Sequence, residues 1–237
     1  MIFSDVLQLG VLLRRYQRFL ADVRLPGAKT VTAHCPNTGS LLGCAAPGST
    51  VWLSRAQNPH RKHPWTWELV QPQDGPLIGI NTARSNLLVR EAIAEGVIAE
   101  LQGYRHVKAE VPFPPGDSRM DLLLTGGRGK SCYVEVKNVT AAVDRGIALF
   151  PDAVTSRGLK HLRALATAVR VGHRAVLCFC VQRSDVDQVR PADAIDPVYG
   201  AALREVLALG VEVIAYGAEV TPSAITLRHR LPVVCPR

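Results

Sequence analysis

The stretch that decides the fold of this 237-residue chain runs Arg119-Met-Asp-Leu-Leu-Leu-Thr-Gly-Gly-Arg-Gly-Lys-Ser-Cys-Tyr-Val-Glu-Val-Lys-Asn-Val139. It contains two apolar, strand-like runs, 119–124 and 132–139, joined by a link that can fold back because glycine tolerates positive φ. Side chains alternate across a strand, so Glu135 and Lys137 share one face, and a hairpin register places Asp121 beside them. The stretch therefore predicts a β-hairpin that presents two carboxylates and an ammonium together.

Asp121, Glu135 and Lys137 have the chemistry of a site that attacks phosphates. Carboxylate oxygens are the ligands that Mg²⁺ prefers, and a bound cation can orient a water for attack on phosphorus. We therefore take Asp121 and Glu135 as ligands of Mg²⁺ or Mn²⁺, and all three residues as catalytic candidates. The alternative interpretation is a solvated Glu-x-Lys salt bridge with an aspartate that serves only as a turn residue.

A helix with periodic apolar residues precedes the hairpin. Ser85 or Asn86 can cap it, and it extends to Leu101. Glu91 lies near the buried face of this helix, which suits a third acid at the metal site, beside Asp121 and Glu135. Glu91 could instead pair with a nearby arginine.

A basic helix follows the hairpin, with Thr155 or Ser156 as its cap. Leu159 and Leu162 belong to its apolar stripe, and positive charge is supplied by Arg157, Lys160, His161 and Arg163. Lys160 could contact a scissile or flanking phosphate, or it could belong to an ordinary solvated cationic face.

Short strand-like runs, broken by Gly, Pro and Asn, fill the first 83 residues. Several strands at this spacing suit a small barrel, and they are expected at 18–25, 30–34, 50–54 and 65–71. The boundary falls near Asn81–Ser85, which divides the chain into a nucleic-acid-binding domain, 1–83, and an α/β domain, 84–237. In the second domain, strands at 174–182 and 211–216 enclose a helix at 197–209. This alternation predicts a mixed sheet flanked by helices.

Two groups of residues in the first domain are candidates for nucleic-acid binding. Arg61 and Lys62 can neutralise phosphates, and the neighbouring Trp65 and Trp67 can stack on bases if they are exposed or form barrel core if they are buried. A second basic group consists of Arg14, Arg15 and Arg18, for which an ordinary exposed strand face is the alternative. The segment 34–40 is either a structural turn or an anion site made of backbone N–H groups.

Composition is consistent with a phosphate-bearing partner. The net charge is +8, and the residues through Arg84 carry nine Lys or Arg against four Asp or Glu. Six cysteines occur without a Cys-x-x-Cys pair, and we interpret them as small core residues. The sequence shows no transmembrane or signal-peptide pattern, so we expect no membrane partner and a cytoplasmic location. The oligomeric state stays open, a homodimer included.

Five longer sequence segments, spread over most of the chain, carry a family resemblance. They are Arg14–Val23, His34–Ser40, Asn58–Leu69, Tyr133–Val139 and Phe150–Leu162. In this order they resemble the bacterial sugar fermentation stimulation protein A family, and the second half resembles the PD-(D/E)xK nuclease superfamily. At Leu159 a polar residue is expected in relatives, and a leucine facing the site would weaken a polar contact there.

The resemblance implies an α/β (α+β) two-domain fold in which an N-terminal OB-like β-barrel is followed by a nuclease-like mixed sheet flanked by helices. It also implies association with DNA and a role in regulating sugar metabolism, especially maltose utilisation. Our first hypothesis is a DNA-binding protein that contacts mainly the phosphate backbone and has little sequence preference. The second is an active Mg²⁺- or Mn²⁺-dependent nuclease, and the third is a regulator that acts through a protein or small ligand.

Overall fold

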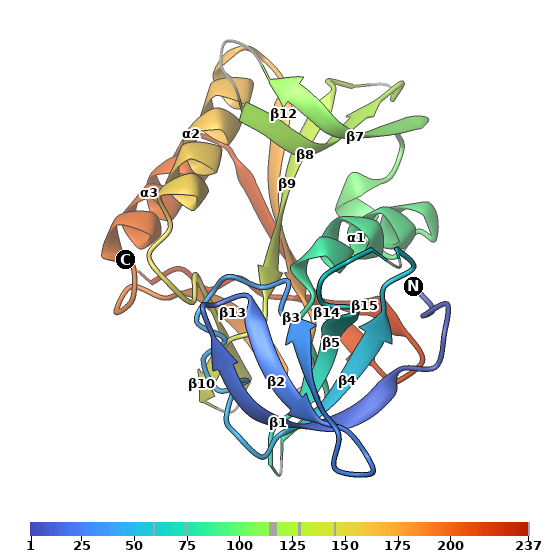
Figure 1. The fold of residues 1–237 in the computed structure, drawn as a ribbon. Helices are drawn as coiled ribbons and strands as arrows, with labels where there is room; N and C mark the ends of the chain where they lie inside the picture. Colours follow the sequence, from blue (N-terminus) through green and yellow to red (C-terminus); the bar gives the residue numbers. More distant parts are fainter. Residues whose placement is uncertain (59, 74, 114–117, 128, 145, 237) are drawn as a thin grey trace.

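The computed structural model describes residues 1–58, 60–73, 75–113, 118–127, 129–144 and 146–236. A small barrel forms one end of the molecule, and an α/β unit forms the other (Figure 1). The predicted fold class, an OB-like barrel followed by a mixed sheet with helices, is confirmed. Pro59 of the basic loop and Arg128 of the hairpin link lie outside the described residues.

The barrel is one sheet with the strand order β3-β2-β1-β4-β5-β6, closed by parallel pairing of β3 with β5. Its apolar side chains, such as Leu12, Leu53 and Trp67, point inward and are fully buried. The strands are β1 (Gln8–Tyr16), β2 (Leu20–Arg24), β3 (Thr30–His34), β4 (Thr50–Arg55), β5 (Trp65–Gln71) and β6 (Ile78–Gly79).

The first strand of the barrel differs from the sequence prediction. Residues 18–25 were expected as one strand, whereas Gln17 and Arg18 have φ values of 51° and 66° and form a turn. An extended strand requires negative φ, so β2 begins only at Leu20. The strand β1, which forms the other half of this hairpin, was not among the predicted strands.

The α/β unit is built on a mixed sheet with the order β15-β14-β12-β9-β8-β7. The strands β9, β12 and β14 are parallel, and the pairs at both edges are antiparallel. The bounds are β7 (His106–Phe113), β8 (Ser118–Thr125), β9 (Cys132–Val139), β12 (Arg174–Val181), β14 (Glu212–Val220) and β15 (Ile225–Leu231).

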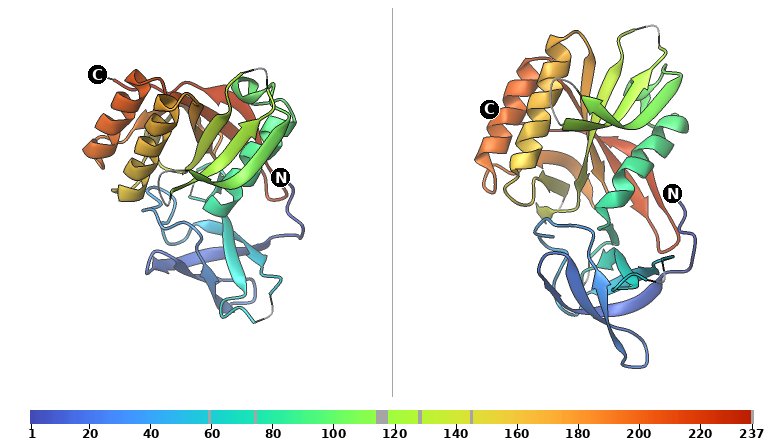
Figure 2. Two further views of the ribbon diagram at one scale, coloured as in Figure 1. Left: turned by 90° about the horizontal axis from the view of Figure 1, so that it is seen from above. Right: turned by 45° about the horizontal axis from the view of Figure 1, so that its top comes forward.

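Helices cover both faces of this sheet (Figure 2). The helix α1 (Ser85–Ala94) packs on one face, and α2 (Ser156–Arg170) and α3 (Pro197–Ala208) pack on the other. The helix α1 ends at Ala94 instead of Leu101, and the 3₁₀ turn η2 (Ala99–Leu101) follows. Gly96 lies between them with a φ of 78°, a left-handed conformation that stops a helix.

A small sheet lies between the barrel and α2. It has the order β10-β11-β13 and consists of β10 (Ala142–Asp144), β11 (Gly146–Phe150) and β13 (Val186–Pro191). The 3₁₀ turn η1 (Thr82–Arg84) leads from the barrel into α1. Of the helices in the described ranges, none combines the length and the apolarity needed to cross a membrane.

The junction between the two parts contains a buried ion pair. Glu68 of β5 is 1% exposed and accepts hydrogen bonds from the guanidinium of Arg84, the amide of Asn81 and the hydroxyl of Ser54. A buried carboxylate needs such partners to offset its lost hydration. The network therefore holds the start of α1 against the wall of the barrel.

Candidate active site

The predicted hairpin forms, and its two strands part next to the acidic residues. Leu122, Leu123 and Leu124 of β8 pair with Val134, Tyr133 and Cys132 of β9. The strand pairing ends at Leu122. Next to it, the backbone N–H of Val136 donates to Oδ2 of the Asp121 side chain at 2.7 Å instead of to a backbone carbonyl of β8. The backbone bond lost from the ladder is thereby recovered by a carboxylate.

Asp121 is held from two sides. Its Oδ2 binds the backbone of β9, and its Oδ1 accepts from the side-chain amide of Asn86, in the first turn of α1, at 2.8 Å. Burial and the neighbouring charge of Glu135 raise the pKa of Asp121, although these hydrogen bonds and Lys137 act in the opposite direction. Without a cation, the simultaneous ionisation of Asp121 and Glu135 is therefore unfavourable.

Glu135 is the most buried charged residue of the site, at 1% exposed. Its Oε1 accepts from Lys137 Nζ at 2.6 Å and also contacts Nδ1 of His161, on α2. Burial alone would raise the pKa of Glu135, but the hydrogen bond from His161 and the charge of Lys137 lower it overall. The second oxygen, Oε2, is buried and has no hydrogen-bond partner among the described residues.

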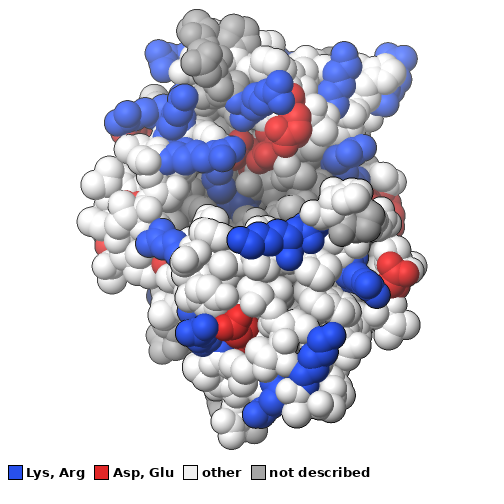
Figure 3. Space-filling model, in the orientation of Figure 1, with Lys and Arg blue, Asp and Glu red and all other residues white. Residues whose placement is uncertain are grey.

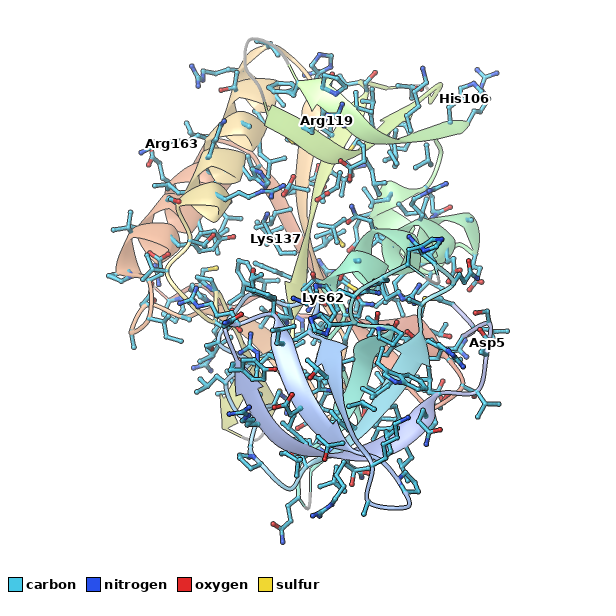
Figure 4. The ribbon with its side chains drawn as sticks, in the orientation of Figure 1. Asp5, Lys62, His106, Arg119, Lys137 and Arg163 are labelled. Carbon is cyan, nitrogen blue, oxygen red and sulfur yellow. The ribbon has the colours of Figure 1, made fainter. Side chains whose placement is uncertain are left out.

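These side chains line a cavity of about 450 Å³ to which both halves of the molecule contribute. The barrel contributes Arg18 and the segment 37–39, and the α/β unit contributes the acids, Lys137 and the residues before α2. Figure 3 shows this face hollowed at its middle, with Lys and Arg side chains around the hollow. In Figure 4, Lys62 of the barrel and Lys137 lie toward that middle, while Arg119 and Arg163 lie further out on the α/β unit.

The structure does not bring Glu91 into this site. Its carboxylate pairs with the Met1 ammonium at 2.5 Å, and it lines a separate cavity with Arg90 and Arg105. Successive residues of a helix are rotated by about 100°, so Glu91 lies on a different side of α1 from Asn86. The prediction of Glu91 as a further acid of the site is therefore corrected, and the residue that α1 supplies is Asn86.

The predicted residues of α2 are exposed or point elsewhere. Lys160 is exposed, outside the residues that line the acidic cavity. Leu159 lines a groove between α2 and α3 with Arg163 and Val198. Because Leu159 faces away from the acids, it does not weaken a polar contact at the site.

The donor set of the site is small. No group of three or more His, Cys, Asp or Glu side chains within the described ranges is arranged to hold a metal ion. Asp121 and Glu135 are thus two carboxylates in a polar cavity. Mg²⁺ is usually bound by one or two carboxylates and keeps several waters, so this set is sufficient for it.

Comparisons with known proteins agree over nearly the whole chain. The model of the SfsA N-terminal OB domain matches residues 13–80, and that of the sugar fermentation stimulation protein RE domain matches residues 83–224. The chain belongs to the sugar fermentation stimulation protein family. The homologue from Thioalkalivibrio sulfidiphilus is 57% identical over 233 residues, 98% of each chain. The Pseudomonas aeruginosa homologue is 52% identical over 234 residues, 98% of this chain and 99% of that one.

A solved structure of the sugar fermentation stimulation family has the same fold throughout. The structure of Pyrococcus furiosus SfsA in complex with Ca²⁺ is 28% identical to this chain, with a TM-score of 0.88. The similarity covers 99% of this chain and 98% of that one. The family resemblance predicted from the sequence is therefore confirmed.

Trp65 and Trp67, the two tryptophans predicted to contact nucleic acid, differ in accessibility. Trp67 is 0% exposed, and its indole N–H donates to the carbonyl of Leu69 at 2.9 Å. It is barrel core and cannot stack on a base, which corrects its candidacy as a nucleic-acid contact. Trp65 is only partly buried against the same core.

The three arginines of the first basic cluster, Arg14, Arg15 and Arg18, have different surroundings. Arg14 pairs with Asp22 at 2.8 Å and lies over the ring of Tyr16. Arg15 donates to backbone carbonyls of the barrel, so its role here is structural. Arg18 is exposed and lines the acidic cavity.

The second basic cluster is also divided. Arg61 donates to the Thr66 hydroxyl at 2.8 Å and lines a cavity of about 640 Å³ beside α1. Lys62 is exposed. In the segment 34–40, Asn37 Oδ1 accepts the N–H of Gly39 at 2.9 Å, the geometry of an Asx turn. That contact favours a structural turn over an anion site.

Sequence reasoning missed two residues of the site. Asn86 was expected only as a helix cap and His161 only as a source of charge. His161 lies four residues before the buried Leu165, at a spacing that places both on one helix face. A histidine in line with an apolar stripe was the available signal.

Proposed function

We propose that this protein binds DNA by its phosphate backbone between the barrel and the α/β unit, and hydrolyses a phosphodiester bond there with a divalent cation. The observation that carries the proposal is the meeting of Asp121, Glu135 and Lys137 in one cavity to which both domains contribute. A solvated salt bridge, the alternative for these residues, would not bury Glu135 to 1%.

The charge around the cavity supports DNA as the partner. Lys62 and Arg119 are exposed on the face that carries the hollow, with Arg163 further out on α2, and exposed cations suit contacts to phosphates. Such contacts carry no sequence information, so we expect weak sequence preference and strong salt dependence. The names of the relatives connect the family with sugar fermentation, and a role in regulating sugar metabolism belongs to the same proposal.

The residues present fit a divalent cation. The Oε2 of Glu135 is buried and has no hydrogen-bond partner in the part of the chain that the structure describes, and the pKa of Asp121 is raised partly by the Glu135 charge. A cation between these carboxylates would give Glu135 Oε2 a partner and would offset the repulsion between the two negative charges. The P. furiosus relative is a complex with Ca²⁺, and Mg²⁺ or Mn²⁺ would be the working ion. When bound, the ion would polarise the phosphate and make a coordinated water more acidic.

The remaining residues of the site position these groups. Asn86 and the Val136 N–H orient Asp121, and His161 holds Glu135 from α2. Lys137 lies 2.6 Å from Glu135 and can direct the attacking water or donate to the phosphate oxygen that gains charge. The reaction adds water across one P–O ester bond, leaving a phosphate monoester and a free hydroxyl.

A denaturing gel of labelled single- and double-stranded DNA, with Mg²⁺ or Mn²⁺ and an EDTA control, tests this proposal. Wild type and Asp121→Asn are compared, and a native gel measures binding in parallel. We expect cleavage that requires the metal and is lost in the variant, with binding retained. Binding without cleavage in folded wild type would limit the function to DNA binding, and absence of both would refute the proposal.

A further inference from the structure

The turn between β1 and β2 has an unfavourable backbone. Gln17 and Arg18 both have positive φ, 51° and 66°, although neither is glycine. The left-handed region is costly for a residue with a Cβ, and strain of this kind persists only where the surroundings impose it. The turn therefore needs contacts that hold it.

Arg15 supplies those contacts. Its guanidinium donates to the Arg18 carbonyl from Nε at 3.1 Å and from Nη2 at 2.7 Å. The same guanidinium donates to the carbonyls of Asn37, Gly39 and Ser40 at 2.7 to 3.0 Å. One side chain thus ties the strained turn to the segment 37–40, of which residues 37–39 line the acidic cavity.

The segment 37–41 is in turn fixed to the α/β unit. The carboxylate of Asp152, in the loop before α2, accepts the N–H of Leu41 at 3.0 Å and the hydroxyl of Ser40 at 3.4 Å. The approach is so close that a side chain at Gly39 would collide with Asp152. The position of the turn relative to the acids is therefore determined by a continuous set of contacts.

The Arg18 side chain has no such attachment. It lines the cavity that contains Asp121 and Glu135, and it forms no hydrogen bond or ion pair with the part of the chain that the structure describes. The other cations of this wall are engaged, since Lys137 binds Glu135 and Arg157 contacts His161. Arg18 is thus an uncommitted guanidinium, held by a strained and clamped backbone, in a cavity whose acids belong to the other domain.

We infer that Arg18 is a catalytic residue contributed by the barrel, whose guanidinium contacts the phosphate at the Asp121–Glu135 site and stabilises its transition state. This assignment rests on the proposed function and extends it, because the hydrolytic site then requires both domains. Guanidinium groups pair with phosphate oxygens through two parallel N–H donors. A donor that acts on developing charge is typically worth about 10²- to 10³-fold in rate.

Arg18→Gly and Gln17→Gly test the assignment as a matched pair. Glycine accepts positive φ at either position, so both variants relieve the same turn, and only the first removes the guanidinium. We expect thermal midpoints of both variants to equal or exceed that of wild type. We expect Gln17→Gly to cleave DNA at the wild-type rate and Arg18→Gly to lose about 10²-fold, more in kcat than in KM.

The controls separate this assignment from the function on which it rests. Lys29→Ala removes a cation from the turn at the far end of β2 (Figure 1) and should cleave normally. Wild-type cleavage together with an unimpaired Arg18→Gly variant would overturn the role of Arg18 alone. An Arg18→Gly variant that is as stable as wild type, with a raised KM and an unchanged kcat, would refute a contact to the transition state. A wild type that neither binds nor cleaves DNA would overturn both proposals.

Discussion

The side-chain amide of Asn86 donates a hydrogen bond of 2.8 Å to Oδ1 of Asp121 and joins the first turn of α1 to β8. The same carboxylate accepts the Val136 N–H from β9. Three elements thus converge on one aspartate, whose orientation is set by a helix, its own strand and the adjacent strand. This convergence explains how a partly buried carboxylate at the edge of a hairpin keeps a fixed orientation.

The geometry of α1 predicts opposite results for two acidic residues. Asp121→Asn should abolish cation binding at the site, and Glu91→Gln should leave it unchanged, because Glu91 pairs with the Met1 ammonium outside the cavity. Calorimetric titration with Ca²⁺, followed by cleavage assays with Mg²⁺, measures both effects. Loss of binding in Glu91→Gln with intact folding would return that residue to the site.

Asp121→Asn should also make the protein more stable at neutral pH. The pKa of Asp121 is raised above 3.8 in the folded state, so the folded protein retains a proton that the unfolded chain releases. The stability of the fold therefore falls as pH rises from 3.8 to the folded-state pKa of Asp121. Above that pKa the ionised carboxylate exerts its whole destabilising effect on the folded state. The Asn86 amide can flip to accept from the new amide, so hydrogen bonding is retained.

A thermal melt of Asp121→Asn without metal measures this gain. At pH 7 we expect a midpoint higher by about 2 °C, roughly the effect of 1 kcal/mol in a chain of this size. The gain should shrink as pH is lowered toward 3.8. An equal or larger gain at low pH would contradict the electrostatic cause.

Replacing His161 should destabilise the fold, because the buried Glu135 carboxylate would lose a hydrogen-bond partner. The pKa of Glu135 lies below 4.5, so its ionised form contributes stability that is present above that value and lost as pH falls through the folded pKa. His161→Phe removes a partner that lowers this pKa, and we expect a loss of about 1–3 kcal/mol near pH 7. The acid-induced decline in stability should flatten as well.

Urea unfolding of the His161 variants at several pH values tests this expectation. His161→Gln keeps a hydrogen-bond donor and should recover most of the loss at neutral pH. If His161→Gln and His161→Phe lose the same stability, packing rather than the hydrogen bond to Glu135 explains the effect.

The salt dependence of DNA binding should report individual phosphate contacts. Lys62→Ala should reduce the slope of log affinity against log salt by about 0.9 for duplex DNA, as expected for one lost contact. Lys29→Ala, in the turn at the far end of the barrel, should leave the slope unchanged. Anisotropy of a labelled duplex between roughly 50 and 200 mM salt measures both, and equal slopes for the two variants would exclude Lys62 from the interface.

The strand pattern alone determined the centre of the candidate site. Glu135 and Lys137 are two residues apart on one strand, so alternation is enough to place them together, and the short hairpin brings Asp121 within reach. These are local relationships, set by backbone geometry over about twenty residues. The barrel and the mixed sheet were predictable for the same reason, since apolar periodicity and turn residues mark short elements.

The contacts made by helices and turns were decided only by the tertiary structure. Asn86 and His161 reach the acids from 35 and 26 residues away, because α1 and α2 pack on opposite faces of the sheet. Helical periodicity shows which face is apolar, but several polar residues border that face, and packing selects among them. This is why Glu91 was predicted and Asn86 was found. Barrel closure likewise buried Trp67, and the Arg15 clamp directed Arg18 to the cavity, because long-range contacts determine where a local conformation points.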